Sequence, residues 1–196
     1  MQKLALTLGL ILVLAFSPMA SACVGKTLRI GTLDSLQQEV LAQILSIIID
    51  ERTGTSVKIV PFASGDKAHE AILAADLDML IEYTGVGQVR IAGAASEAPG
   101  ETLYEQVKAR YQKELNLIWL KPFGFEDRGF SSAALPAEAA PVVRKDTLKK
   151  FPALSRLINK LGGRIDDATM AQLEAEAKQE GAKVAARRFL KERKLI

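Results

Sequence analysis

Short apolar runs alternate with longer segments of helical spacing in the first half of the chain after residue 26. The three apolar runs, each bounded by turn residues, predict strands: 27–31, 56–62 and 78–83. A helix is expected between the first two, capped by Asp34 or Ser35 and ended by Gly54. A second helix is expected over 67–74. This β-α-β-α-β order predicts an α/β fold with a mostly parallel sheet.

The second half of the chain continues the alternation and then becomes helical. A loop over 92–100 and an amphipathic segment over 101–115 precede an apolar strand over 117–120. Residues 124–141 are rich in Pro, Ala, Gly and Ser without periodicity, which predicts a linker or exposed loop. A short strand is expected over 142–143. Three helices are expected after it, over 146–161, 166–179 and 181–194. The whole pattern predicts a doubly wound α/β sheet with C-terminal helices.

The N-terminus has the pattern of an export signal. Lys3 precedes an apolar run over 4–16, and Ala20 and Ala22 place small residues where a signal peptidase cleaves. The run is shorter than the roughly 20 residues that span a bilayer. Residues 1–22 are therefore interpreted as a signal peptide, which predicts a periplasmic or cell-envelope protein.

Cys23 is the only cysteine, so an internal disulfide is excluded. Residues 19–23 resemble a bacterial lipobox, with Ala20 where leucine is more usual. Two interpretations stay open: Cys23 is acylated and anchors the protein to a membrane, or the chain is cleaved after Ala22 without lipidation.

Composition and charge narrow the function classes. The net charge of +3 is too small to indicate nucleic acid as a partner. The sequence has no nucleophile elbow and no phosphate-binding loop, so we expect that the protein is not an enzyme and binds no cofactor. Asp76 and Asp78 fall at one end of the predicted strand and Glu82 at the other, so these carboxylates are too far apart to bind one metal ion. His69 is expected on the surface of helix 67–74 and not in a metal site.

The strand over 78–83 ends in Glu82, Tyr83 and Thr84. Ligands of open α/β sheets bind beyond the carboxyl ends of the strands, so this tip is a candidate site. Tyr83 would supply one face of an aromatic cage for a quaternary ammonium group. The alternative is that Tyr83 belongs to a turn formed by Gly85 and Gly87. Trp119 is expected in the core.

Several stretches together resemble one family, the substrate-binding proteins of ABC importers for glycine betaine, choline and carnitine. They are Ile30-Gly31-Thr32 with Gln38, Asp76-Leu-Asp78 running into Glu82-Tyr83-Thr84-Gly85, Ile118-Trp119-Leu120 with Phe123-Gly124-Phe125, and Ala140-Pro-Val-Val-Arg144-Lys-Asp146. The resemblance implies a type II periplasmic binding protein fold, an ABC permease as partner and a quaternary-ammonium solute as ligand. The ligand-binding residues that it implies are Thr32, Asp34, Gln38, Tyr83, Thr84 and Phe125.

The chain departs from the family's pattern in two places. The family has a second lobe where this chain has only residues 124–141, so residues 24–196 are expected to form a single lobe. At the first helix, Leu33 and Asp34 stand where the family has polar residues that include a Lys. The resulting negative charge favours a cation over a solute held by its carboxylate.

Two hypotheses follow. The first is an exported module that binds a small quaternary-ammonium or cationic solute. The alternative is a degenerate lobe without a transport role, which acts as a protein–protein interaction module or forms a homodimer through the face once covered by the second lobe.

Overall fold

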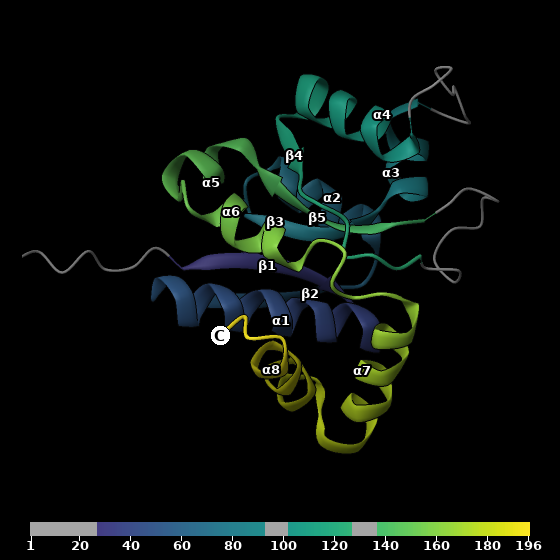
Figure 1. The fold of residues 1–196 in the computed structure, drawn as a ribbon. Coiled ribbons are helices and arrows are strands. Elements are labelled where there is room, and N and C mark those ends of the chain that lie inside the picture. Colours follow the sequence, from purple (N-terminus) through teal and green to yellow (C-terminus); the bar gives the residue numbers. More distant parts are fainter. Residues whose placement is uncertain (1–26, 93–101, 127–136) are drawn as a thin grey trace, which may run out of the picture.

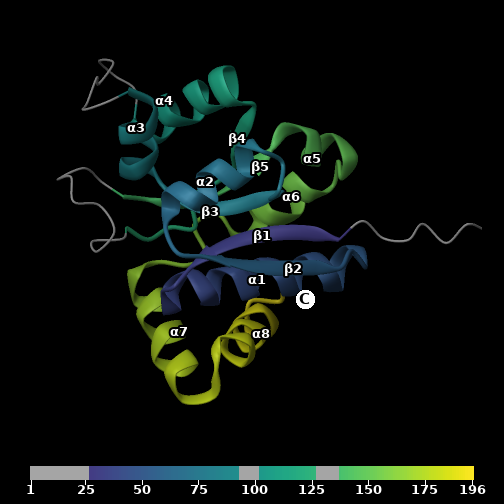
Figure 2. The same cartoon turned by 180° about the vertical axis from the view of Figure 1, so that it is seen from behind.

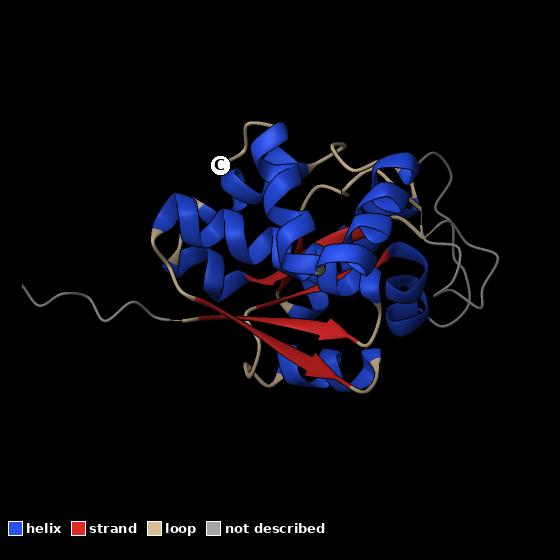
Figure 3. Ribbon diagram, turned by 90° about the horizontal axis from the view of Figure 1, so that it is seen from below, coloured by secondary structure: helices blue, strands red, loops and turns tan. Residues whose placement is uncertain are grey.

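The computed structural model describes residues 27–92, 102–126 and 137–196, and in these it contains one mixed sheet of the order β2-β1-β3-β5-β4. The strands are β1 (Leu28–Leu33), β2 (Val57–Phe62), β3 (Met79–Tyr83), β4 (Leu117–Trp119) and β5 (Ala139–Arg144). β1 pairs in parallel with β2 and β3, whereas β5 runs antiparallel to both of its neighbours. Figure 3 shows β1 and β2 side by side with their arrows pointing the same way.

Helices cover both faces of the sheet, which confirms the doubly wound α/β fold (Figures 1 and 2). One face packs against α1 and α6, with α7 and α8 behind α1, and the other face packs against α2 and α4. The α-helices are α1 (Leu36–Thr53), α2 (Gly65–Leu73), α3 (Thr84–Ala92), α4 (Leu103–Arg110), α5 (Lys145–Lys150), α6 (Leu154–Ile158), α7 (Asp167–Glu180) and α8 (Ala182–Glu192). A π-helix, η1 (Tyr111–Leu115), extends α4, and a 3-10 turn, η2 (Asn159–Leu161), extends α6.

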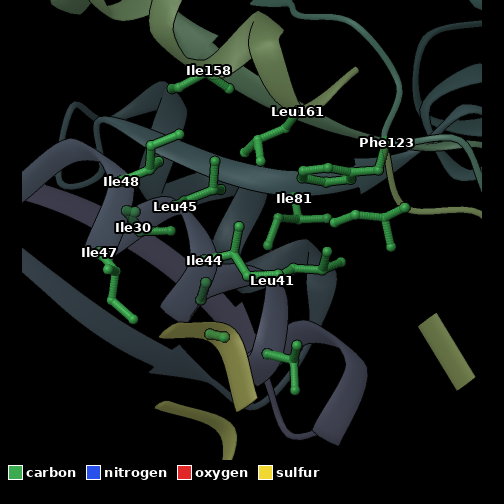
Figure 4. Packing of buried hydrophobic residues seen from close by; sticks show 14 of the residues in the cluster. Ile30, Leu41, Ile44, Leu45, Ile47, Ile48, Ile81, Phe123, Ile158 and Leu161 are labelled. Carbon is green, nitrogen blue, oxygen red and sulfur yellow. The ribbon is translucent and has the colours of Figure 1, made fainter. Parts of the chain in front are cut away.

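The first helix forms as its caps predict. The Ser35 side chain accepts a hydrogen bond from the Gln38 N–H at its start, and Gly54 adopts a left-handed conformation at its end. α1 is buried almost all round, so even the consecutive residues Ile47, Ile48 and Ile49 are covered. A helix with apolar residues on opposite sides must be covered from both, here by the sheet and by α7 and α8, and only a narrow strip that includes Glu39 and Asp50 reaches solvent. Figure 4 shows Leu41, Ile44 and Leu45 of this helix in one cluster with Ile30 and Ile81.

Two predicted boundaries are wrong. β5 begins at Ala139, so residues 139–141 of the predicted loop belong to a strand that is paired on both sides. Alanine and proline have low strand propensity, so the pairing with β3 places them in the sheet, together with hydrogen bonds that the Leu120 and Phe123 N–H groups donate to the Pro141 and Ala139 carbonyls. The single helix predicted over 146–161 is divided into α5, α6 and η2 around Pro152. The remaining predicted loop segments, 93–100 and 127–136, lie outside the described residues.

The turn predicted at Gly85 and Gly87 is also wrong, because these residues begin α3. A Cβ atom at Gly87 would lie 2.8 Å from Trp119 Cζ2 and 2.9 Å from Val107 Cγ1. Both neighbours are buried, which confirms Trp119 as a core residue. Gly87 therefore serves close packing between α3 and the sheet rather than a turn.

We expect Gly87→Ala to lower the free energy of unfolding by about 1–3 kcal/mol through overpacking against Trp119. Helix propensity alone would raise it by about 1 kcal/mol, so the sign of the change distinguishes the two effects. Urea denaturation followed by circular dichroism measures the change. Val89→Ala, at a half-exposed position of the same helix, is the control and should have little effect. A stabilised Gly87→Ala protein would contradict this packing.

Candidate functional site

An open groove of about 500 Å³ lies at the carboxyl ends of β1 and β2, beside the N-terminus of α1. We call it the strand-end groove. Its lining consists of Thr32, Leu33, Asp34, Ser35, Leu36, Glu39, Pro61, Phe62 and Ala63. Two of these residues are carboxylates and one is aromatic, and among the described residues no Lys or Arg lines it. Proline at position 61 is tolerated because β2 is the edge strand of the sheet.

A much smaller cavity of about 10 Å³ lies next to the strand-end groove and shares Thr32 and Leu33 with it. Gln38, Gly65 and Glu82 are among its other lining residues. The cavity is about the size of one water molecule. A solute can therefore occupy the strand-end groove but not the space beneath it.

Tyr83 lies inside the protein, with 1% of its surface exposed. Its hydroxyl donates a hydrogen bond to Gln37 Oε1 at 2.7 Å, and the Gln38 side-chain amide lies 3.3 Å from the same hydroxyl oxygen. The Gln38 amide also lies 3.4 Å from the Ile81 carbonyl oxygen. These contacts join the first turn of α1 to β3, and the ring of Tyr83 is not offered to the strand-end groove in this conformation.

Thr84 is fully buried and holds the segment that leads into β5. Its hydroxyl accepts a hydrogen bond from the Glu138 N–H at 3.1 Å, and its own N–H donates to the Glu138 carbonyl at 3.0 Å. Phe125 is 3% exposed and stacks on Phe123 at a centroid distance of 6.4 Å. Thr84 and Phe125 are therefore structural residues in this conformation.

The predicted site residues thus occupy different layers. Thr32 and Asp34 line the strand-end groove, while Gln38, Tyr83 and Thr84 lie beneath the strand ends. Cys23 lies outside the described residues. Phe62 and Glu39 also line the groove but are not among the ligand-binding residues that the resemblance implies; Phe62 ends the second strand, and Glu39 lies in the first turn of α1.

Glu82 is buried at the tip of β3 and joins two helices through charge. Arg90 Nε of α3 lies 3.3 Å from Glu82 Oε2, and Arg90 Nη1 lies 3.0 Å from Asp66 Oδ1 of α2. Burial raises the pKa of Glu82 from 4.5 to about 7, although the Arg90 charge and the Tyr83 N–H act in the opposite direction. Glu82 is therefore partly protonated near neutral pH.

His69 is half-buried rather than on the surface, which corrects the prediction. Its ring packs edge-on against Tyr111 at a centroid distance of 5.9 Å, and Tyr111 packs in the same way against Trp119 at 5.3 Å. Burial, together with the nearby Arg90 charge, lowers the pKa of His69 and so favours the neutral ring. In the part of the chain that the structure describes, no cluster of His, Cys, Asp and Glu is arranged to hold a metal ion.

Comparisons with known proteins agree with the fold and with the resemblance. The family model for the substrate-binding domain of the ABC-type glycine betaine transport system matches residues 26–130 and 126–192. A carnitine transport binding protein (OpuCC) of Listeria monocytogenes is 26% identical over 151 residues, which are 74% of this chain and 46% of that protein. An ergothioneine transport permease/ergothioneine binding protein (EgtU) of Helicobacter pylori is 29% identical over 103 residues, 52% of this chain and 18% of that protein. The chain therefore spans less than half the length of these curated relatives.

Solved structures with the same fold include a glycine betaine/carnitine/choline ABC transporter protein, with a TM-score of 0.78 and 15% identity. The alignment covers 87% of this chain and 99% of that one. YehZ of Escherichia coli, in its apo state, aligns with a TM-score of 0.74 and 16% identity over 88% of this chain and all of the other. Among the described residues, no helix has the length and apolar character needed to cross a membrane.

The raised pKa of Glu82 predicts a pH dependence of stability. The folded protein binds a proton at Glu82 more tightly than the unfolded chain, so this contribution is complete below pH 4.5 and is lost as the pH rises through 7. The free energy of unfolding should fall by up to about 3 kcal/mol over that range because of this group. Denaturant unfolding at a series of pH values measures it.

Glu82→Gln is the matched control, because glutamine keeps the shape and does not titrate. His69 contributes a pH dependence of the opposite sign, because its lowered pKa stabilises the folded state as the pH rises. Subtracting the free energies of unfolding of Glu82→Gln from those of the parent protein at each pH removes this contribution. Parallel profiles for the two proteins would contradict a proton on buried Glu82.

Proposed function

The chain belongs to the family of substrate-binding domains of ABC-type glycine betaine transport systems, and from that premise we propose that it binds a small quaternary-ammonium or other cationic solute in the strand-end groove. Members of this family are transport binding proteins rather than enzymes. We propose further that residues 1–22 direct export to the periplasm or cell envelope, that Cys23 is a lipid attachment site and that an ABC permease is the partner.

The lining of the strand-end groove carries the proposal. Asp34 and Glu39 bring two negative charges to one side of it, and Phe62 offers an aromatic side chain. A cation over an aromatic face gains about 0.5–2 kcal/mol, and a nearby carboxylate adds to the attraction. The volume of about 500 Å³ is within the usual range for small-molecule sites. The N-terminus of α1 alone would favour an anion, and Asp34 offsets that preference.

The other predicted residues would act with the groove in two ways. Thr32 would contact the solute beside Asp34. Gln38, Tyr83 and Thr84 would fix the strand ends through their hydrogen bonds, and Phe125 would support them through the core. A rigid support of this kind keeps the groove in a binding conformation before the solute arrives.

We propose that residues 24–196 form a single lobe in which the strand-end groove binds from one side. The two segments matched by the family model meet at residues 126–130, which supports a missing insertion at that point. The alternative function is an interaction module, and the apolar residues Leu33, Leu36 and Phe62 favour it because a second protein surface would cover them. A second copy of this chain would be such a surface.

Thermal unfolding with candidate solutes tests the proposal. Both cores are formed by residues between Leu28 and Ile196, so the chain from Val24 onward retains the described fold. The solutes are glycine betaine, proline betaine, choline, carnitine, ectoine and ergothioneine. One that is present at 100 times its dissociation constant should add about 2.7 kcal/mol and raise the midpoint by several degrees.

Asp34→Asn should weaken the apparent affinity for the solute by at least about fivefold, because it removes a carboxylate of the groove. The thermal shift at a given solute concentration should fall accordingly. Asp50→Asn removes an exposed carboxylate at the other end of α1 and should leave the shift unchanged. The absence of a shift with every solute would contradict the proposal. A stable dimer in sedimentation equilibrium would then favour the interaction module.

A further inference from the structure

Basic residues crowd the segment that forms α5, α6 and η2. Residues 144–164 contain seven Lys or Arg and one acidic residue, Asp146, so this segment has a net charge of +6 in a chain whose total is +3. All seven basic residues are exposed or half-exposed. We call this surface the α5–η2 face, and its basic residues are Arg144, Lys145, Lys149, Lys150, Arg156, Lys160 and Arg164.

The charge of the α5–η2 face is largely unneutralised. Among the described residues, Lys149 is the one member with an ion pair, to Asp146 at 3.0 Å. On α8, by comparison, two of the four basic residues are paired: Arg187 with Glu51, and Arg188 with Glu176 and Glu180. A surface whose positive charges lack local partners has a positive potential that attracts anionic surfaces.

One edge of this face lies at the end of the sheet where β1 starts (Figure 1). The Asp78 carboxylate accepts one hydrogen bond from the Arg29 N–H of β1 and another from the Thr147 hydroxyl of α5, both at 2.9 Å. Lys150 and Phe151 also line an apolar groove of about 250 Å³ together with Leu28. The chain that precedes Leu28, which includes Cys23, therefore joins the fold beside the α5–η2 face.

We propose that the α5–η2 face binds an anionic lipid surface. The basic residues of this face nearest to the start of β1, Lys145, Lys149, Lys150 and Arg156, would contact the phosphates of the headgroups, and half-buried Phe151 with exposed Pro152 would meet the interface between them. The proposed lipid attachment at Cys23 favours a membrane over an acidic protein, because it would bring this end of the sheet next to the bilayer, and this step rests on the proposed function. The strand-end groove lies at the opposite ends of β1 and β2 and stays open to solvent. This inference does not depend on the ligand of that groove.

Vesicle cosedimentation tests the inference with the chain from Val24 onward, which lacks the apolar run. Binding is expected to vesicles that contain phosphatidylglycerol and not to pure phosphatidylcholine vesicles. It should be strong at low ionic strength and disappear near 1 M salt, where the Debye length falls to about 3 Å. Each basic residue near the surface contributes about fivefold in affinity, so Lys150→Gln with Arg156→Gln should weaken binding about 25-fold.

The control is Lys183→Gln with Lys191→Gln, which removes the same charge from exposed positions of α8. It should bind within about twofold of the parent protein. Circular dichroism of both double variants confirms that they are folded. Equal binding to the two kinds of vesicle, no binding to either, or the same loss in the control would overturn the proposal.

Discussion

Burial of α1 between the sheet and the C-terminal helices is the constraint on which the rest of the structure depends. The sheet covers one side of this helix, and α7 and α8 cover the other, so its run of three isoleucines is buried. Burying such side chains contributes about 1.5–3 kcal/mol each. The C-terminal helices are therefore required by the sequence of α1, and the fixed helix in turn holds Ser35 and Gln38 at the strand ends.

The tip of β3 illustrates how buried polar residues serve as scaffold. Glu82 joins α3 and α2 through Arg90, Tyr83 joins the first turn of α1, and Thr84 holds Glu138 at the entry of β5. Buried polar groups are costly unless they are paired, so each of these contacts fixes one neighbouring element in place. The strand-end groove is thus supported from below by Glu82 and by Tyr83 and Thr84, two of the six residues that the resemblance implied as ligand contacts.

The parts of the fold that depend on local signals were predictable. Ser35, Gly54 and Asp166 mark helix ends through contacts within a few residues, and the structure places the helix ends there. The start of β5 and the helical conformation of Gly87 depend on distant partners, so the pattern missed them. The site divides in the same way. Asp34 follows its strand directly and lines the groove as expected, whereas the burial of Tyr83 depends on Gln37, 46 positions away in the chain.

The central claim is that this single lobe binds a cationic solute at the strand-end groove. The most direct test is a titration of the chain from Val24 onward with choline and glycine betaine, followed by the backbone amide chemical shifts. Saturable shifts confined to residues 32–39 and 62–65 are the predicted result. Shifts that gather elsewhere on the fold, or none at saturating solute, would contradict it.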